Sequence, residues 1–185
     1  CLIQNKLGAV NAGAFDLQAG CSGWVYALSV AKQFIQTGAY NYILVVGVDI
    51  LSSVTDWTDR ATCVLFGDAA GAAVVGPTEF GTGILATHLG SDGSGGELLK
   101  IEAGGSKLPP SEETVKNRQH YIQMEGKEVY KFAVRIMGEA SIKALEICGL
   151  TPEDVDLFIP HQANIRIIDA AVHRLGLPEE KVFIN

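Results

Sequence analysis

The 185-residue sequence lacks the features of several protein classes. No apolar run reaches the roughly 18 residues that a membrane-spanning helix needs, and no signal peptide is visible. The net charge is -7, with 14 basic against 21 acidic residues, which argues against broad nucleic-acid binding and gives no support for attachment to an anionic membrane. The chain begins with Cys1 rather than methionine, so we expect its true N-terminus to be missing.

Cysteine is scarce, and its spacing lacks the usual metal motifs. The four cysteines form no C-x-x-C pair, and the four histidines stand in no zinc-like spacing relative to them. With 48% hydrophobic residues, the chain can build one substantial core without disulfides. We therefore predict a reduced, cytoplasmic protein without a metal site. Three cysteines are interpreted as small buried or partly exposed hydrophobic side chains: Cys1, Cys63 and Cys148.

The remaining cysteine, Cys21, stands at a change in the pattern of the sequence. Before it, F-D-L-Q alternates apolar and polar residues, which predicts a half-buried strand over about 13–19. After it, apolar residues recur at steps of three and four, which predicts a helix over about 22–37. The apolar run at 41–51 predicts a strand buried on both faces. Strand, helix and strand in this order form a βαβ unit.

Similar patterns predict the elements between the two ends of the chain. Residues 1–8 are typical of the last turns of a helix, and 61–76 predict two short strands around a Gly-Asp turn. A loop-rich stretch follows, in which we expect one strand at 83–90 and exposed hairpins or loops. Residues 124–149 predict a long amphipathic helix ended by glycine, and Thr151 then caps a short acidic turn.

The last part of the chain repeats the arrangement around Cys21. Residues 155–176 predict a buried strand that ends at Pro160, a polar reactive residue, His161, and a helix. Residues 181–185 begin another strand. We therefore predict two βαβ-type halves, each with one reactive side chain at the carboxyl end of a strand, where open α/β sheets place their chemistry.

The position of Cys21 suits a covalent nucleophile. A helix start favours thiolate through the helix dipole and through backbone N–H groups without intrahelical partners, and one of these groups can stabilise an oxyanion. The small neighbours of Cys21 allow a substrate to approach the sulfur. The local features equally allow a structural cysteine at a tight turn.

His161 has two interpretations as well. A lone histidine at a strand end is commonly satisfied by local structure, but the position of His161, equivalent to that of Cys21 in the other half, favours catalysis. Three other histidines lack such a context, and we expect them to be surface or packing residues: His88, His120 and His173.

Three segments together resemble signatures of the β-ketoacyl-acyl-carrier-protein synthase III family: D-L-Q-A-G-C-S-G-W-V-Y-A-L, T-D-R-A-T-C-V-L-F-G-D-A-A-G-A-A-V-V and P-H-Q-A-N-I-R-I-I-D. The resemblance implies an α/β, thiolase-like layered αβαβα fold that is built from two βαβ-type halves and incomplete at both ends. Residues 1–80 would be the remainder of the N-terminal half with the nucleophile. Residues 81–185 would be the start of the C-terminal half with the catalytic histidine.

The resemblance also implies an acyltransferase that initiates fatty acid synthesis. Cys21 would be acylated by a short acyl-CoA primer. His161 would hydrogen-bond the malonyl thioester carbonyl and stabilise the enolate left by decarboxylation, which then attacks the acyl-Cys21 carbonyl. This chemistry needs no cofactor. The implied partners are acyl-CoA, acyl carrier protein and a second copy of the chain, with neither nucleic acid nor a membrane.

Further positions match family residues that contact substrates. Arg60 matches a residue that packs on the adenine of CoA, although a surface charge is the simpler interpretation of the residue alone. Asn164 matches a residue near the pantetheine arm, and Lys131 and Arg166 match basic residues that receive the acidic carrier protein. Three residues match the wall of the primer pocket, although their pattern alone indicates ordinary core: Leu51, Leu65 and Phe66.

The chain also departs from the family pattern. The third catalytic residue of the family is an asparagine in a G-N-T-S-type motif that lies beyond a strand like 181–185, and Asn185 lacks that motif. The N-terminal βαβ portion of the family is also missing, and Trp24 stands where phenylalanine is expected. We therefore expect a segment from the middle of an enzyme that is inactive by itself.

Four alternatives stay open. A plant-type polyketide synthase and a hydroxymethylglutaryl-CoA synthase also join acyl units through a cysteine, but H-Q-A-N favours synthase III over both and over thiolases. A non-catalytic partner subunit would need neither Cys21 nor His161. A cysteine hydrolase would need His161 within hydrogen-bond reach of Cys21 as its base.

Overall fold

The computed structural model describes all residues, 1–185, and divides into two compact units. Unit 1 comprises residues 1–47 and 72–79, and unit 2 comprises residues 48–71 and 80–185. The division that the sequence predicts at residue 80 stays a prediction. No helix combines the length and the apolar character that crossing a membrane requires.

Unit 1 is organised around one amphipathic helix. Helix α1 (Leu2–Lys6) opens the chain, and a 3₁₀ turn η1 (Gly20–Ser22) leads into α2 (Gly23–Gln36), so the helices predicted at 1–8 and 22–37 are confirmed. Gly38 follows α2 with φ of 73°, a left-handed conformation that glycine adopts without strain.

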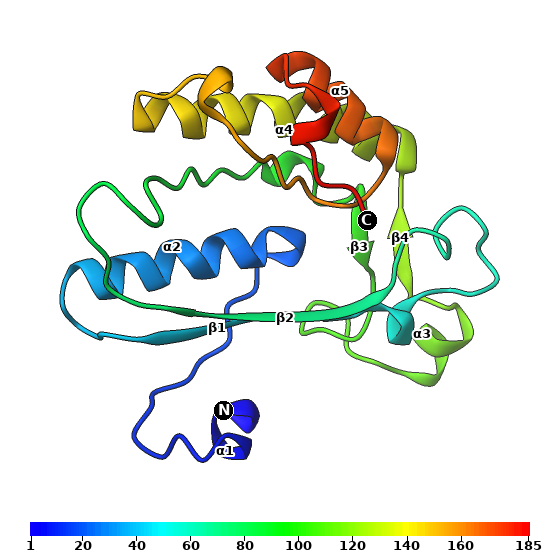
Figure 1. The fold of residues 1–185 in the computed structure, drawn as a ribbon. Coiled ribbons are helices and arrows are strands. Elements are labelled where there is room, and N and C mark those ends of the chain that lie inside the picture. The colour runs from blue at the N-terminus through cyan, green and yellow to red at the C-terminus, as the bar shows by residue number, and fades with distance from the viewer. The chain divides into compact units, whose positions relative to one another are not determined.

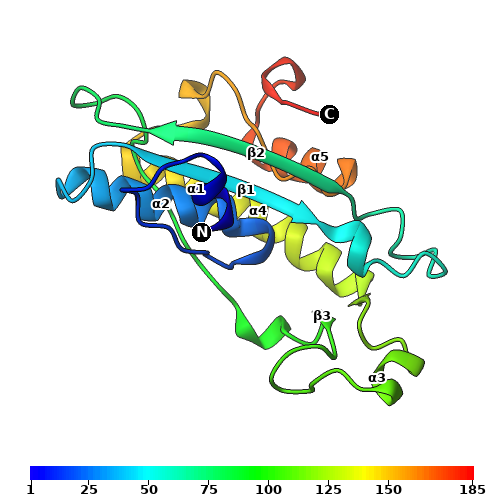
Figure 2. The same ribbon diagram turned by 90° about the horizontal axis from the view of Figure 1, so that it is seen from below.

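Helix α2 lies beside strand β1 (Ile43–Ile50) in Figures 1 and 2. The side chain of Trp24 makes a contact between them. A Cβ atom at Gly47 of β1 would lie 3.2 Å from Cε3 of Trp24, so glycine makes room for the indole ring. The tryptophan at the position where phenylalanine was expected therefore fits because residue 47 of the strand is glycine.

Two predictions about strands near β1 are wrong. Residues 12–19 form no strand, because no other strand pairs with them, and Phe15 is 67% exposed. Strand β1 pairs only with β2 (Asp68–Val75) in a two-stranded sheet, and Val45 is its one buried residue. The first βαβ unit is therefore incomplete, and β1 is not covered on both faces.

The segment before β2 is a turn and not the first of two strands. The carboxylate of Asp59 accepts hydrogen bonds from the backbone N–H of Ala61, at 3.0 Å, and from the hydroxyl of Thr62, at 2.7 Å. These bonds curl residues 59–62, because an aspartate that binds backbone two residues on favours a turn over an extended chain. Only the second predicted strand of 61–76 is confirmed, as β2.

A second small sheet lies in the loop-rich part of unit 2. Strands β3 (Leu99–Ile101) and β4 (Ile122–Met124) pair antiparallel, with Lys100 opposite Gln123, and the short helix α3 (Glu112–Lys116) lies between them in the sequence. No strand forms at 83–90, where Gly83 has φ of 78° and interrupts an extended chain. The predicted hairpin-like region is thus present, but its strands lie at other residues.

The core of unit 2 is the contact between α4 (Gly126–Cys148) and α5 (Ile165–Leu175), which lie side by side in both views (Figures 1 and 2). Helix α4 confirms the helix predicted at 124–149. Gly138 is buried and makes room for the Arg174 side chain, which reaches Glu139 at 3.3 Å. Helix α5 buries one face, which consists of Ile167, Ile168, Ala171 and Leu175.

In place of the two strands predicted before and after α5, the structure has a single pair of bridged residues. Phe158 and Val182 form an isolated parallel bridge, so the order strand, helix, strand is present in its shortest form. Because the bridge is single, Leu157 and Ile159 are 55% and 67% exposed, and the prediction of a buried strand is wrong. The acidic turn that Thr151 was expected to cap is confirmed as η4 (Pro152–Asp154).

Candidate active site

Cys21 is the middle residue of the 3₁₀ turn η1, two residues before α2 begins at Gly23, and it is exposed. Gly20 adopts a left-handed conformation with φ of 53°, and no atom lies within 4 Å of the place where a Cβ of Gly20 or Gly23 would stand. The predicted position of the thiol, at a helix start among small residues, is confirmed. Gly20 and Gly23 add no side chain on either side of this exposed cysteine.

The start of α2 carries no side-chain cap. Ser22 occupies the N-cap position, but its hydroxyl makes no capping hydrogen bond to the helix. The first backbone N–H groups of a helix have no partners within that helix, and they carry partial positive charge. The N–H of Gly23 donates to the backbone oxygen of Gly20 within η1, so it is the partial positive charge of this helix end that can stabilise negative charge near Cys21.

His161 follows the buried Pro160 and is itself exposed. Three residues later, Asn164 begins α5: its side-chain oxygen accepts a hydrogen bond from the backbone N–H of Arg166 at 2.9 Å. The backbone oxygen of Asn164 accepts further bonds from Ile167 and Ile168, at 3.0 and 3.2 Å. The side-chain oxygen of Asn164 is thus used by the fold, and its amide NH₂ is the group that can serve a ligand.

Gln162, to which the sequence analysis assigned no role, joins two segments of unit 2. Its side-chain nitrogen donates to the backbone oxygens of Pro160, at 3.0 Å, and Phe183, at 3.1 Å. Its side-chain oxygen accepts from the backbone N–H of Asn185 at 3.2 Å. The only sequence signal for this role was the glutamine within H-Q-A-N.

The turn directly before Arg60 is held by Asp56. The Asp56 carboxylate accepts hydrogen bonds from the hydroxyl and the backbone N–H of Thr58, at 2.7 and 2.9 Å, and a bidentate pair from Arg118. These bonds, above all those from Arg118, hold the pKa of Asp56 well below its ordinary value. Arg118 also stacks on Tyr121, 4.9 Å from the ring centre. Arg60 itself is exposed.

Arg118 has an unusual backbone conformation. Its φ is 59°, and it is the one residue other than glycine with a positive φ. The left-handed conformation costs a non-glycine residue about 1 kcal/mol. The ion pair with Asp56 and the contact with Tyr121 offset this cost. The one signal for this cluster in the sequence is the Asp-x-Thr pattern, which is typical of a side-chain turn and does not predict Arg118 as a partner.

None of the three residues predicted to line the primer pocket is fully buried. Leu51 and Phe66 are half-buried, and Leu65 is 42% exposed. None of them lines either of the two hollows found in unit 2.

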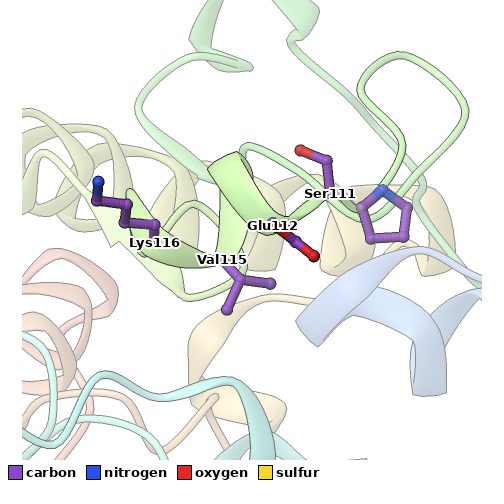
Figure 3. A pocket seen from close by; sticks show the side chains of 5 residues that line it. Ser111, Glu112, Val115 and Lys116 are labelled. Atoms are coloured by element: carbon purple, nitrogen blue, oxygen red, sulfur yellow. The ribbon is translucent and has the colours of Figure 1, made fainter.

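One hollow, of about 510 Å³, is lined by Pro110 and residues of α3 (Figure 3). The other, of about 440 Å³, contains His120, whose buried Nδ1 has no hydrogen-bond partner.

The two basic residues predicted to receive a carrier protein differ in their surroundings. Lys131 lies on α4 and pairs with Glu128 at 2.7 Å, so part of its charge is neutralised. Arg166 lies in the first turn of α5 and is exposed. His161, Asn164 and Arg166 thus come together on the segment that leads into α5 in unit 2, whereas Cys21 belongs to unit 1.

No three histidine, cysteine, aspartate or glutamate side chains lie close enough to hold a metal ion. No disulfide links the four cysteines, of which Cys63 and Cys148 are half-buried and Cys1 is exposed.

Solved structures share this fold. The chain superimposes on 3-oxoacyl-[acyl-carrier-protein] synthase III from Aquifex aeolicus with a TM-score of 0.88 and 46% identity, covering 100% of this chain and 55% of that one. For the synthase III from Thermus thermophilus, the TM-score is 0.89 and the identity is 48%, covering 100% and 56%. These neighbours are thiolase-like, so the predicted fold class is confirmed.

Relatives match over the whole chain. Beta-ketoacyl-[acyl-carrier-protein] synthase III from Caldanaerobacter subterraneus subsp. tengcongensis is 58% identical over 185 residues, and that from Natranaerobius thermophilus is 56% identical over 188. The matches cover 100% of this chain but 56% and 57% of the relatives, so the chain spans just over half of their length.

Two family models match as well. The model of 3-oxoacyl-[acyl-carrier-protein (ACP)] synthase III matches residues 15–93, and the model of the C-terminal part of the same synthase matches residues 145–185. The first range contains Cys21 and Arg60, and the second contains His161 and Asn164. With the relatives and the fold, these matches show that the chain belongs to the 3-oxoacyl-[acyl-carrier-protein] synthase III family.

Proposed function

We propose that this chain carries the nucleophile and the enolate-stabilising histidine of a β-ketoacyl-acyl-carrier-protein synthase III. The supporting observation is that Cys21 lies at the uncapped start of α2, among residues that leave the sulfur accessible. The full-length synthase would join a short acyl-CoA primer to malonyl-acyl carrier protein and thereby initiate fatty acid synthesis. It would act in the cytoplasm, as a homodimer and without a cofactor.

In the first step, the Cys21 thiolate attacks the thioester carbonyl of the primer. The new carbon–sulfur bond forms the acyl-Cys21 thioester, and the CoA thiolate leaves. Backbone N–H groups at the start of α2 stabilise the negative charge on the oxygen in the transition state. The same end of the helix favours the thiolate over the thiol before the attack.

In the second step, a neutral His161 donates a hydrogen bond to the thioester carbonyl of the malonyl group. The carbon–carbon bond to the carboxylate breaks, CO₂ leaves, and the electron pair forms an enolate whose oxygen the imidazole stabilises. The enolate carbon attacks the acyl-Cys21 carbonyl. The Cys21 thiolate leaves, and the product is a 3-oxoacyl-acyl carrier protein.

The other predicted residues would bind the substrates. Arg60, exposed directly after the turn that Asp56 holds, would stack on the adenine of CoA. The amide NH₂ of Asn164 would contact the pantetheine arm, and Lys131 and Arg166 would attract the acidic carrier protein. The wall of the primer pocket would consist of Leu51, Leu65 and Phe66.

The activity test needs a full-length synthase. We define the grafted synthase as the Caldanaerobacter relative in which these 185 residues replace the matching segment. After incubation with a labelled short acyl-CoA, digestion is expected to place the label on the Cys21 peptide. The matched control is Cys63→Ala, which should acylate normally. Label on the Cys63 or Cys148 peptide, with Cys21 unlabelled, would overturn the proposal.

We expect the 185 residues alone not to catalyse condensation. Strand β1 exposes apolar side chains, with Leu44, Val48 and Ile50 at 45%, 55% and 63% exposure, and such strands promote association or aggregation. Turnover by a soluble, folded 185-residue chain at the rate of the grafted synthase would contradict this expectation.

A priming enzyme of polyketide synthesis is the second candidate. The priming β-ketosynthase from the R1128 polyketide biosynthetic pathway superimposes with a TM-score of 0.82 at 39% identity. The fatty acid role is favoured because the relatives named synthase III reach 58% identity. A grafted synthase that condenses only with a polyketide carrier protein, and not with a fatty acid carrier protein, would favour the second candidate.

A further inference from the structure

The parallel pairing that ends before His161 is interrupted by a proline. Phe158 donates its backbone N–H to the oxygen of Lys181 at 2.7 Å, and Phe183 donates to the oxygen of Phe158 at 2.9 Å. The next rung of a parallel ladder would use the N–H and the C=O of residue 160. Pro160 has no N–H, so the backbone cannot form this rung.

The side-chain amide of Gln162 takes the place of the missing peptide group. Its nitrogen donates to the oxygen of Phe183 at 3.1 Å, where the N–H of residue 160 would donate. Its oxygen accepts from the N–H of Asn185 at 3.2 Å, where the C=O of residue 160 would accept. The second N–H of the amide donates to that same Pro160 oxygen at 3.0 Å.

Both donors of the Gln162 amide and its acceptor are therefore used. The amide extends the parallel pairing by one rung beyond the proline and joins residues 160–162 to residues 183–185. His161 lies between the two residues that this rung fixes, and its own side chain is exposed. On the other side, the Asn164 cap fixes the chain where α5 begins.

From this arrangement we infer that Gln162 is a positioning residue that acts through His161. The inference rests on the proposed function, in which the imidazole meets the malonyl thioester oxygen. Such a contact requires placement within about 0.5 Å. The amide rung supplies this placement in a segment that has no helix or strand of its own.

The first test is Gln162→Met in the grafted synthase. This variant keeps the length of the side chain but removes all three hydrogen bonds. We expect malonyl decarboxylation to slow by about 10- to 100-fold, because a displacement near 1 Å can cost about 100-fold. Acylation of Cys21 should stay unchanged. The matched control is Gln123→Met, since Gln123 is an exposed residue of β4 in the same unit.

The second test restores the missing backbone donor. In the double variant Pro160→Ala/Gln162→Met, residue 160 has an N–H that can donate to the oxygen of Phe183. We expect the double variant to decarboxylate malonyl substrate faster than Gln162→Met alone. Cys21 acylation in the same variants separates this result from a role in general stability, because loss of stability would slow both steps together.

Gln162→Glu is the variant to use if the methionine variant does not fold. It keeps the acceptor for Asn185 but cannot donate to either carbonyl when ionised. The expected result is again slow decarboxylation with normal Cys21 acylation. Equal loss of both steps in the folded variant would overturn the inference, as would decarboxylation at the parental rate.

His161→Ala separates failure of the inference from failure of the proposed function. Loss of decarboxylation in His161→Ala, with none in Gln162→Met, would overturn the inference alone. Full decarboxylation by His161→Ala would overturn the proposed role of the histidine, and the inference with it.

Discussion

The start of α2 and the start of α5 resemble each other in sequence order and differ in construction. At α2, Ser22 makes no capping bond, and Gly20 and Gly23 leave open space beside Cys21. At α5, the side chain of Asn164 caps the helix, and Gln162 fixes the chain before it. The first start has no side-chain cap and little side-chain bulk, whereas the polar side chains before and at the second start are hydrogen-bonded within the fold.

The largest expected effect comes from removing the nucleophile. Cys21→Ser in the grafted synthase should lose condensation by roughly 10⁴- to 10⁶-fold, a range typical of lost nucleophiles. Malonyl decarboxylation should persist, because it depends on the start of α5 and not on that of α2. Product mass and CO₂ release measure the two reactions. Parallel loss of both reactions would break the distinction between the two helix starts.

The next effect is smaller and concerns stability: only α5 has a side-chain cap, so the matched substitutions at the two helix starts should differ. Asn164→Ala should lower the free energy of unfolding by about 1 kcal/mol, because it removes the side-chain acceptor at the start of α5. Ser22→Ala, the matched change at α2, should stay within about 0.5 kcal/mol, because no capping bond is lost there. Urea unfolding of both variants measures the contrast, and equal losses would contradict it.

Substitution of Gly23 tests whether the missing side chain serves the substrate or the fold. A Cβ at Gly23 meets no atom within 4 Å, so Gly23→Ala should preserve the fold and raise the free energy of unfolding by about 0.4–1 kcal/mol. The added methyl group should still slow Cys21 acylation, because it narrows the approach to the sulfur. Stability and single-turnover acylation are measured on the same variant. Faster or unchanged acylation would contradict the assigned role of the open space.

The turn directly before Arg60 resembles the start of α5, because its polar side chains form hydrogen bonds within the protein. Asp56 accepts bonds from Thr58 and Arg118. The hydrogen bonds from Arg118 lower the pKa of Asp56, so they stabilise the fold above the ordinary aspartate pKa. This contribution is lost as pH falls through the lowered pKa. Asp56→Asn should therefore destabilise the protein at pH 7, and this destabilisation should shrink progressively as pH falls below about 4. Urea midpoints across that range test the sign, and a pH-independent difference would contradict it.

Sequence patterns predicted most of the helices, and the positions of Cys21 and His161 shortly before two of them, because helix periodicity and glycine stops are local. The starts of α2 and α5 and the ends at Gly149 and Gly176 follow from residues within a few turns. The strands were predicted poorly. The alternating pattern at 13–19 resembles a strand, but a strand exists only where a distant segment supplies its partners.

The sequence also did not predict hydrogen bonds between side chains and partners that are far apart in the chain. Asp56 and Arg118 are separated by 62 positions, and no periodicity connects them. Gln162 reaches Asn185, 23 positions away, because Pro160 leaves a rung unfilled. A proline followed two residues later by an amide side chain suggests such a replacement only when the partner strand is known.

The most direct test of separate roles for the two helix starts is His161→Ala in the grafted synthase. Labelled acyl-CoA measures Cys21 acylation, and CO₂ release measures malonyl decarboxylation in the same sample. The proposal predicts substantial acylation, because the start of α2 activates the thiol, with decarboxylation slower by about 100- to 1000-fold. Loss of Cys21 acylation in the folded variant would contradict the proposal and favour a hydrolase-like pair in which His161 is the base for Cys21.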